Sequence, residues 1–544
     1  MKFNISRRSF LKRSMMLGTG IVATTSRLSA YDPEWRISQP FDTIISNGLI
    51  YNGDGSPPFR GDAGIKNGRI SALGSLGDYA DKVVDVKGMA ICPGFVDIHT
   101  HTDTNLLQCP AGDSRIFQGI TTDVGGNCGG SPFPDGPYDS VSSFLDALRK
   151  QKNGINYCTF TGQGSIRSAV IGDWNAQATE AQIQTMKDLL DKQLEQGSIG
   201  LSCGLEYAPG AYASDQELVE LLKIVARHNG LFAIHMRNED DRVKEAVSEA
   251  ISMAFKAGVR LQISHLKAQN FNNWHKGPEL LRLIDNAKRN GLDIAFDRYP
   301  YTAFSTGLIS FIPLDGRQGS VEDVLERLQN RTTSTEFGVY ALSRIARLGG
   351  MRNVIISACT LSHNRDTFMG KTLEECVAIS GKSVWDFIRD LLIEERLAPD
   401  IIAFAMTEDN VRLFLSHPLG MPASDGSVYS PQGPLSENIP HPRSYGTFPR
   451  FLGKYCREGK LMDFSQAVKK MTSLPASRIG LKDRGLLIPG YCADIVVFDP
   501  AKVIDKATFT DPHRYPEGIS HVWVNGEHTI RNGEHTGALA GKIL

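Results

Sequence analysis

The chain lacks several features that would point to particular classes of protein. It has no excess of positive charge: 59 Lys and Arg stand against 60 Asp and Glu, so nothing indicates a nucleic-acid partner. Its nine cysteines include no Cys-x-x-Cys pair and no regular spacing, so a disulfide framework is not indicated. The apolar stretch near the N-terminus, MMLGTGIVATTS, is too short to be a stable membrane anchor. With 544 residues, the chain is long enough for two or three domains and at least one large core.

The N-terminus has the pattern of an export signal. Residues 6–12 read SRRSFLK, which matches a twin-arginine signal, and small residues near Ala30 offer a cleavage point. The first thirty residues carry six bases and no acid, so removing them from a chain of formal charge −1 leaves an acidic protein of about −7. We predict that residues 1–30 are a twin-arginine signal peptide, that the export machinery is a partner, and that the mature protein is periplasmic or otherwise exported.

The two ends of the remaining chain have the same texture. Residues 41–92 alternate short apolar runs with Asn-Gly and Gly turns, which is typical of β-strands. Residues 481–544 repeat this pattern in RGLLIPGYCADIVVFDP and ISHVWVNGEHTIRNGEH. The sequence therefore predicts a small β-sandwich domain built from both termini.

The middle of the chain, residues 93–480, alternates helices and strands. Helices are predicted over 179–197, where Thr-x-x-Gln is a capping box, and over 214–229, 242–257 and 278–290, each followed by an apolar strand. Such βα alternation over more than 200 residues predicts an α/β fold of the (β/α)8 TIM-barrel type. The alternation lapses over about 309–354, which we interpret as a small insertion near the barrel mouth that forms a lid or wall of the pocket.

Histidines follow three of the predicted barrel strands. An apolar run over residues 91–98 reads as one strand and leads into His99 and His101, which share a face because alternate residues of a strand do so. The strands LFAIH and VRLQISH end on His235 and His265. The active site of such a barrel lies at the carboxyl ends of its strands, and neutral imidazoles are good zinc ligands. The sequence therefore predicts a metal site at this end of the barrel.

Two further side chains are candidates for the same site. Cys128 follows a second strand within GITTDVGGNCGGS, where the glycines leave room for a metal or a substrate against the backbone. Asp425, within GMPASDGSVYS, follows a short apolar strand late in the barrel, where a carboxylate can take a proton from water and return it to a leaving amine. Taken alone, each is better explained as an inert loop residue. Because both follow strands of the barrel that carries the four histidines, we predict that Cys128 is a thiolate ligand and that Asp425 is a general base.

At these motifs the chain resembles the N-acyl-D-amino-acid deacylases, the D-aminoacylases of the amidohydrolase superfamily. The resemblance covers about residues 41–540 and rests on PGFVDIHTHTD, GITTDVGGNCGGS, GLSCGLEYAPGAYAS, HMRNEDD, ISHLK, DRYPYTAFST, ASDG and HPRSYGTFPRFLGKY. It implies a site for one or two zinc ions with the ligands His99, His101, Cys128, His235 and His265, in which Cys128 is shared. It also implies that Asp425 is the general acid/base and that Tyr299, Ser305 and Arg443 hold the substrate carboxylate, for which an arginine fork is well suited.

The chain departs from this family in the wall of the pocket. Phe304 stands where related chains often have glycine, and the stretch GLISFIPL lacks the added arginine of branches that cleave N-acyl-D-glutamate. These departures favour a substrate with a neutral or apolar side chain over an acidic one.

The leading hypothesis is an exported zinc amidohydrolase that cleaves the linear amide bond of N-acyl-D-amino acids, which are small-molecule substrates. One alternative is an exported dipeptidase or amidase that acts on D-amino-acid-containing peptides or cyclic amides. Many such enzymes need a carboxylated lysine at the fourth strand, and SIGLSCGLEYAPG has no lysine. Another alternative is an exported scaffold or metal store without catalysis, against which the intact ligand set and Asp425 argue.

Overall fold

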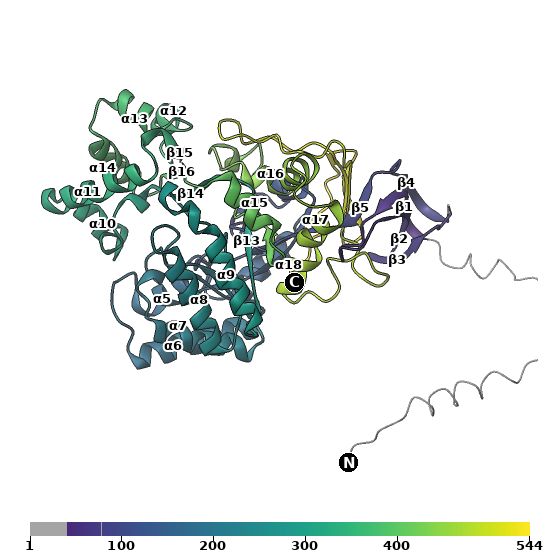
Figure 1. Cartoon of the computed structure of the whole chain (residues 1–544), viewed down its shortest axis with the longest axis horizontal. Helices are drawn as coiled ribbons and strands as arrows, with labels where there is room; N and C mark the ends of the chain where they lie inside the picture. The colour runs from purple at the N-terminus through teal and green to yellow at the C-terminus, as the bar shows by residue number, and fades with distance from the viewer. Residues whose placement is uncertain (1–40, 78) are drawn as a thin grey trace, which may run out of the picture.

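The computed structural model describes residues 41–77 and 79–544, so the signal peptide predicted for residues 1–30 lies outside the described residues. A barrel occupies the middle of the molecule. A largely helical insertion, α10 to α14, lies on one side of it, and a sheet that contains the first strands, β1 to β5, lies on the other (Figure 1). Within the described range, no helix is both long and apolar enough to cross a membrane.

Among the described residues, eight parallel strands form the barrel. In order they are β6 (Phe95–Asp97), β7 (Ile120–Gly125), β8 continued by β9 (Asn156–Thr159 and Thr161–Gly162), β10 (Gly200–Gly204), β11 (Leu231–His235), β12 (Arg260–Ile263), β13 (Ile294–Arg298) and β17 (Gly420–Pro422). A parallel bridge between Thr100 and Gly426 joins the last strand to the first and closes the barrel. The predicted (β/α)8 fold is thereby confirmed.

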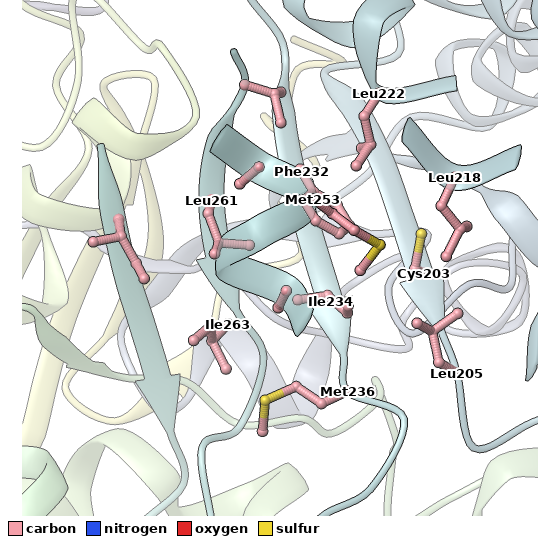
Figure 2. Close-up of a cluster of buried hydrophobic side chains, with 14 of the residues drawn as sticks. Cys203, Leu205, Leu218, Leu222, Phe232, Ile234, Met236, Met253, Leu261 and Ile263 are labelled. Atoms are coloured by element: carbon pink, nitrogen blue, oxygen red, sulfur yellow. The ribbon is translucent and has the colours of Figure 1, made fainter. Parts of the chain in front are cut away.

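Amphipathic helices cover the outside of the barrel. They are α4 (Val141–Gln151), α5 (Gln163–Ile171), α6 (Glu180–Glu195), α7 (Asp215–Arg227), α8 (Val243–Ala257), α9 (Gly277–Arg289) and α15 (Glu408–Ser416). Thr179 caps α6 with the predicted capping box, and the Ser214 hydroxyl caps α7. Figure 2 shows Met253 of α8 beside Phe232 of β11, and Leu218 of α7 beside Cys203 of β10. This burial holds the strand ends, and with them the histidines, in place.

Both ends of the chain contribute to one nine-stranded sheet in the described range, as predicted. Its strands are β1 (Phe41–Ile50), β2 (Phe59–Lys66), β3 (Arg69–Gly74), β4 (Ala80–Asp85), β5 (Ala90–Pro93), β18 (Ile495–Phe498), β19 (Ile519–Val524), β20 (Glu527–Arg531) and β21 (Glu534–His535). The two termini meet where β5 pairs antiparallel with β18. A bridge from Arg69 to Cys492 folds the sheet over a core that contains Trp523. The final residues leave the sheet, and Ile543 bridges to Tyr157 of β8.

The strand predicted over residues 91–98 is in fact two strands that belong to different sheets. β5 lies in the terminal sheet and β6 in the barrel, and Gly94 separates them. The Gly94 N–H donates to the Asp494 carbonyl at 2.8 Å, and a Cβ atom on Gly94 would lie 2.1 Å from Thr121 Oγ1. The prediction of one strand is wrong because both halves are apolar and the close contact at Gly94 is made by a residue distant in sequence.

The insertion is also larger than the predicted range of 309–354. It contains the antiparallel strands β14 (Ala303–Gly307), β16 (Asp400–Phe404) and β15 (Val354–Ala358), with the helices α10 (Val321–Gln329), α11 (Arg331–Arg347), α12 (Ser362–Phe368), α13 (Leu373–Ser380) and α14 (Val384–Glu394). These elements share one apolar core. The range was underestimated because β14 pairs with β16 across nearly a hundred residues, a pairing that local sequence patterns do not show.

Replacing Gly94 by alanine tests whether the close contact between the two sheets requires glycine. We expect Gly94→Ala to destabilise the protein by about 1–3 kcal/mol, because the added methyl overlaps Thr121 and neighbouring backbone must shift. The measurement is the midpoint of thermal unfolding. Gly130→Ala is the matched control, since a Cβ there meets no atom within 4 Å. Equal midpoints for the two variants would show that the join tolerates a side chain.

Candidate metal centre

His99 and His101 follow β6, and the end of the last barrel strand fixes their position. The Asp425 N–H donates to the His99 carbonyl at 2.9 Å, and the His101 N–H donates to the Gly426 carbonyl at 2.7 Å. The two imidazoles converge on the same carboxylate oxygen: Asp425 Oδ1 is 3.3 Å from His99 Nε2 and 2.9 Å from His101 Nε2. The contacts that close the barrel therefore also bring these three side chains together.

Cys128 lies in the turn after β7 with its backbone in the left-handed region, at φ 53°. The following Gly129 has φ 81°, and a Cβ atom there would lie 2.5 Å from the Gly204 nitrogen, so only glycine fits this turn. The turn aims the thiol at the histidines: its sulfur is 3.3 Å from His99 Nε2 and 3.5 Å from His265 Nε2.

The donor atoms of the predicted ligands form two groups that share the Cys128 sulfur, and the atoms of each group lie within 4.8 Å of one another. One group contains His99, His101, Cys128 and Asp425, and the other contains Cys128, His235 and His265. A third group combines His235 with Glu206 and Glu239. His235 is the last residue of β11, and His265 lies two residues beyond β12. The structure thus brings the six residues singled out from the sequence into one cluster, with the Cys128 sulfur common to both halves.

The cluster fits a divalent cation. Imidazole nitrogen, thiolate sulfur and carboxylate oxygen are the donors that zinc takes in proteins. His235 Nδ1 is buried and has no hydrogen-bond partner among the described residues, which leaves a desolvated lone pair. A bound cation would satisfy that atom, so both the donor set and the unpaired nitrogen match a metal site.

The charges in the cluster also favour a cation. Burial tends to raise the pKa of the Cys128 thiol, but His99 and His265 outweigh it and lower the pKa well below its ordinary value. Burial opposes protonation of His101, yet the Asp425 carboxylate and the thiolate raise its pKa to about 9. The site therefore concentrates a thiolate and a carboxylate among imidazoles, an arrangement that positive charge stabilises.

Acidic side chains behind the cluster orient the histidines, and the sequence analysis did not assign them a role. Asp297 Oδ1 is 3.0 Å from His99 Nδ1 and accepts from the His265 N–H at 2.8 Å, so the ring of His99 turns Nε2 towards the sulfur. Glu239 Oε1 is 3.0 Å from His265 Nδ1 and accepts from Lys267 at 2.6 Å. The signal was available, because Asp297 and Glu239 lie in the motifs DRYPY and HMRNEDD.

A cavity of about 1230 Å³ opens over the cluster, and Tyr299, Ser305 and Arg443 all line it. Arg443 does not stand free, however: its Nη1 donates to Asp425 Oδ2 at 2.7 Å. Its guanidinium also lies 5.0 Å from the centre of the Tyr299 ring, and the Tyr299 hydroxyl is buried without a partner in residues 41–77 and 79–544. The predicted base and the predicted carboxylate-binding arginine therefore form one ion pair, which the sequence analysis did not anticipate.

His441, another residue without an assigned role, holds this arginine in place. Its Nδ1 accepts from the Arg443 N–H at 3.0 Å, and its Nε2 lies 3.0 Å from the Ala303 carbonyl. Burial, followed by the nearby arginine charge, lowers the pKa of His441 well below its ordinary value, so the imidazole is neutral. It ties the start of α16 (Arg443–Arg450) to β14, the strand that carries Ser305.

The profile of the amidohydrolase family matches residues 82–530. This chain belongs to the amidohydrolase family. Within the family it belongs to the group of N-acyl-D-amino-acid deacylases, as two relatives from Alcaligenes xylosoxydans xylosoxydans show. It is 35% identical to a D-aminoacylase over 525 residues, which are 93% of this chain and 98% of that protein. It is 34% identical to an N-acyl-D-glutamate deacylase over 90% of this chain and 94% of that protein.

A solved structure agrees with these relatives. The N-acyl-D-glutamate deacylase from Bordetella bronchiseptica, complexed with zinc and a phosphonate inhibitor that mimics the tetrahedral intermediate, superposes with a TM-score of 0.79. It is 34% identical, and the match covers 93% of this chain and all of that one. This amidohydrolase is therefore an enzyme that acts on amide bonds.

Removal of the shared thiol tests the arrangement. We expect Cys128→Ala to lower bound zinc per chain and to abolish turnover, because both donor groups lose their common sulfur. Metal analysis of the purified protein and a fixed-substrate assay measure the two effects, and circular dichroism checks folding. Cys376→Ala, which removes a buried thiol in the insertion, is the matched control. Wild-type zinc content and rate in Cys128→Ala would refute the assignment.

Proposed function

We propose that this amidohydrolase uses one or two zinc ions to hydrolyse N-acyl-D-amino acids to a D-amino acid and a carboxylic acid. The observation that carries the proposal is the Cys128 sulfur set between two histidine pairs, with Asp425 beside them at the floor of one cavity. Two comparisons support the proposal. The relative that this chain matches over 98% of the relative's length is a D-aminoacylase. The matching crystal structure holds zinc and an inhibitor that mimics the tetrahedral intermediate.

Asp425 is placed to move the proton that the reaction requires. His99, His101, Cys128, His235 and His265 would hold zinc, and the bound ion would supply a Lewis acid to polarise the amide carbonyl and activate water. Burial raises the pKa of Asp425, but Arg443 and His99 outweigh it and lower the pKa well below its usual value, so the carboxylate is ionised and able to accept a proton from water. It then returns that proton to the amide nitrogen as the C–N bond breaks, and the amine leaves neutral.

The substrate carboxylate is placed by Arg443, Tyr299 and Ser305. Arg443 uses one Nη atom for Asp425, and its side chain lines the same cavity as the other two residues. The Tyr299 hydroxyl, which has no partner in the part of the chain that the structure describes, is available as a second donor. Because the carboxylate and the amide are then fixed at two points, inversion of the α-carbon moves one of them out of place, which selects the D-enantiomer.

The wall beside this carboxylate site favours a neutral side chain. Phe304 is buried and lines the cavity. Arg317 also lines the cavity, but its Nε and Nη2 donate to the carbonyls of Ile312 and Ser310 at 2.7 and 2.9 Å, and its Nη1 donates to the Glu206 carbonyl at 3.2 Å. A side-chain carboxylate beside Phe304 would therefore be buried without a cation partner, which is costly.

We also propose that the protein is exported by the twin-arginine route. The support for this is the pair Arg7-Arg8 within SRRSFLK, followed by an apolar stretch and small residues. A fusion of residues 1–40 to a reporter, with Arg7 and Arg8 replaced by lysine as the control, tests the proposal directly. Export of both fusions, or of neither, would contradict it.

Loss of the proton acceptor should separate metal binding from catalysis. We expect Asp425→Asn to keep zinc but to lower kcat by several orders of magnitude, because the asparagine side chain cannot accept the proton from water. Zinc content and kcat on an N-acyl-D-leucine measure this split. Asp188→Asn, on an exposed position of α6, is the control. Retention of a large fraction of wild-type kcat in Asp425→Asn would place the proton shuttle elsewhere.

A panel of chiral substrates tests the pocket. We expect N-acetyl-D-Leu, -D-Met and -D-Phe to exceed N-acetyl-D-Glu in kcat/KM by at least about tenfold, which corresponds to roughly 1.4 kcal/mol. The L-enantiomers should be poor substrates. The rates are compared at one pH with saturating zinc. Equal or higher rates on N-acetyl-D-Glu would show that the side chain does not face Phe304.

A further inference from the structure

One face of helix α11 in the insertion carries two arginines into the cavity of the metal centre. Tyr340, Arg344 and Arg347 are spaced by four and three residues, so they lie on one side of the helix, and all three line the cavity. In the part of the chain that the structure describes, neither arginine has a carboxylate within 4.0 Å. Arg347 Nε is buried and has no partner among the described residues.

A third guanidinium adds to this positive wall. Arg317 donates to three backbone carbonyls and has no carboxylate partner among the described residues. Burial and the neighbouring Arg344 lower the pKa of Arg317, which is the effect of a like charge close by. Partly buried arginines without a counter-ion carry a desolvation cost, and a ligand with negative charge offsets that cost.

The arginine wall lies across the metal centre from the site proposed for the α-carboxylate. On one side, Arg443 pairs with Asp425, which contacts His99 and His101. The Cys128 sulfur lies between the two donor groups. On the other side, His235 Nε2 is 3.4 Å from Glu206 Oε2, and the Glu206 carbonyl accepts from Arg317. A substrate whose α-carboxylate lies at Arg443 and whose amide lies at the centre directs its acyl arm towards this wall.

We propose that Arg344 and Arg347 form a subsite for a carboxylate at the far end of the acyl group. The favoured substrates would then be N-dicarboxyl-D-amino acids, such as N-succinyl or N-glutaryl derivatives with a neutral side chain. The subsite rests on the proposed deacylase function. Arg317, held by its carbonyls, acts as the fixed neighbour that keeps the wall positive, while the two α11 arginines donate charge-assisted hydrogen bonds to the acyl carboxylate.

The test compares acyl groups of similar length on one amino acid. We expect wild-type kcat/KM on N-succinyl-D-Leu to exceed that on N-butyryl-D-Leu, its neutral analogue, by at least tenfold. In the Arg344→Gln, Arg347→Gln double variant the ratio of these two constants should fall at least tenfold. Arg331→Gln, an exposed arginine on the same helix, should keep the wild-type ratio.

The outcomes separate this subsite from the deacylase function. If neither compound is hydrolysed, both proposals fail. If wild-type enzyme cleaves the butyryl compound at least as well as the succinyl compound, the subsite alone is overturned, whether or not the double variant folds. A faster reaction on N-acetyl-D-Glu than on N-succinyl-D-Leu would overturn the assignment to the acyl arm, because the anion would then bind as the side chain.

Discussion

The site depends on the position of one sulfur atom. Cys128 lies in a left-handed turn that bulky residues rarely adopt, and its sulfur comes within 3.5 Å of imidazoles from two different barrel strands. Because it belongs to both donor groups, its position decides whether the histidine pairs form one centre or two unrelated clusters. The turn is possible because Gly129 packs against the backbone of β10.

The contacts that close the barrel also bring the residues of the site together. The hydrogen bond from the Asp425 N–H to the His99 carbonyl joins the last strand to the first, and it places the Asp425 carboxylate on both histidines of the first strand. Compensating charges surround this contact: Arg443 pairs with the carboxylate, and Lys267 pairs with Glu239 behind His265. The buried charges are thus paired, which is the condition under which such groups are tolerated.

Local patterns in the sequence were enough to predict the barrel, the helix caps at Thr179 and Ser214, and the β domain from both termini, because each depends on periodicity or on neighbouring residues. They failed where distant residues decide the outcome. Thr121 makes Gly94 a break between two sheets, and Asp400–Phe404 completes the insertion sheet with β14. For the same reason, the sequence did not predict the ion pair of Arg443 with Asp425 or the contact of Asp297 with His99. The position of a residue at a strand end does not show which side chain it will contact. The six cluster residues could be selected because each follows a strand end, whereas their roles stay predictions.

The central claim, that the sulfur of Cys128 holds the metal together with histidines, can be measured on the unmodified protein. The measurement is X-ray absorption at the zinc edge on enzyme loaded with one equivalent of zinc. The account predicts a sulfur neighbour at about 2.3 Å together with nitrogen or oxygen neighbours at about 2.0–2.1 Å. A spectrum that contains only nitrogen and oxygen neighbours would contradict it.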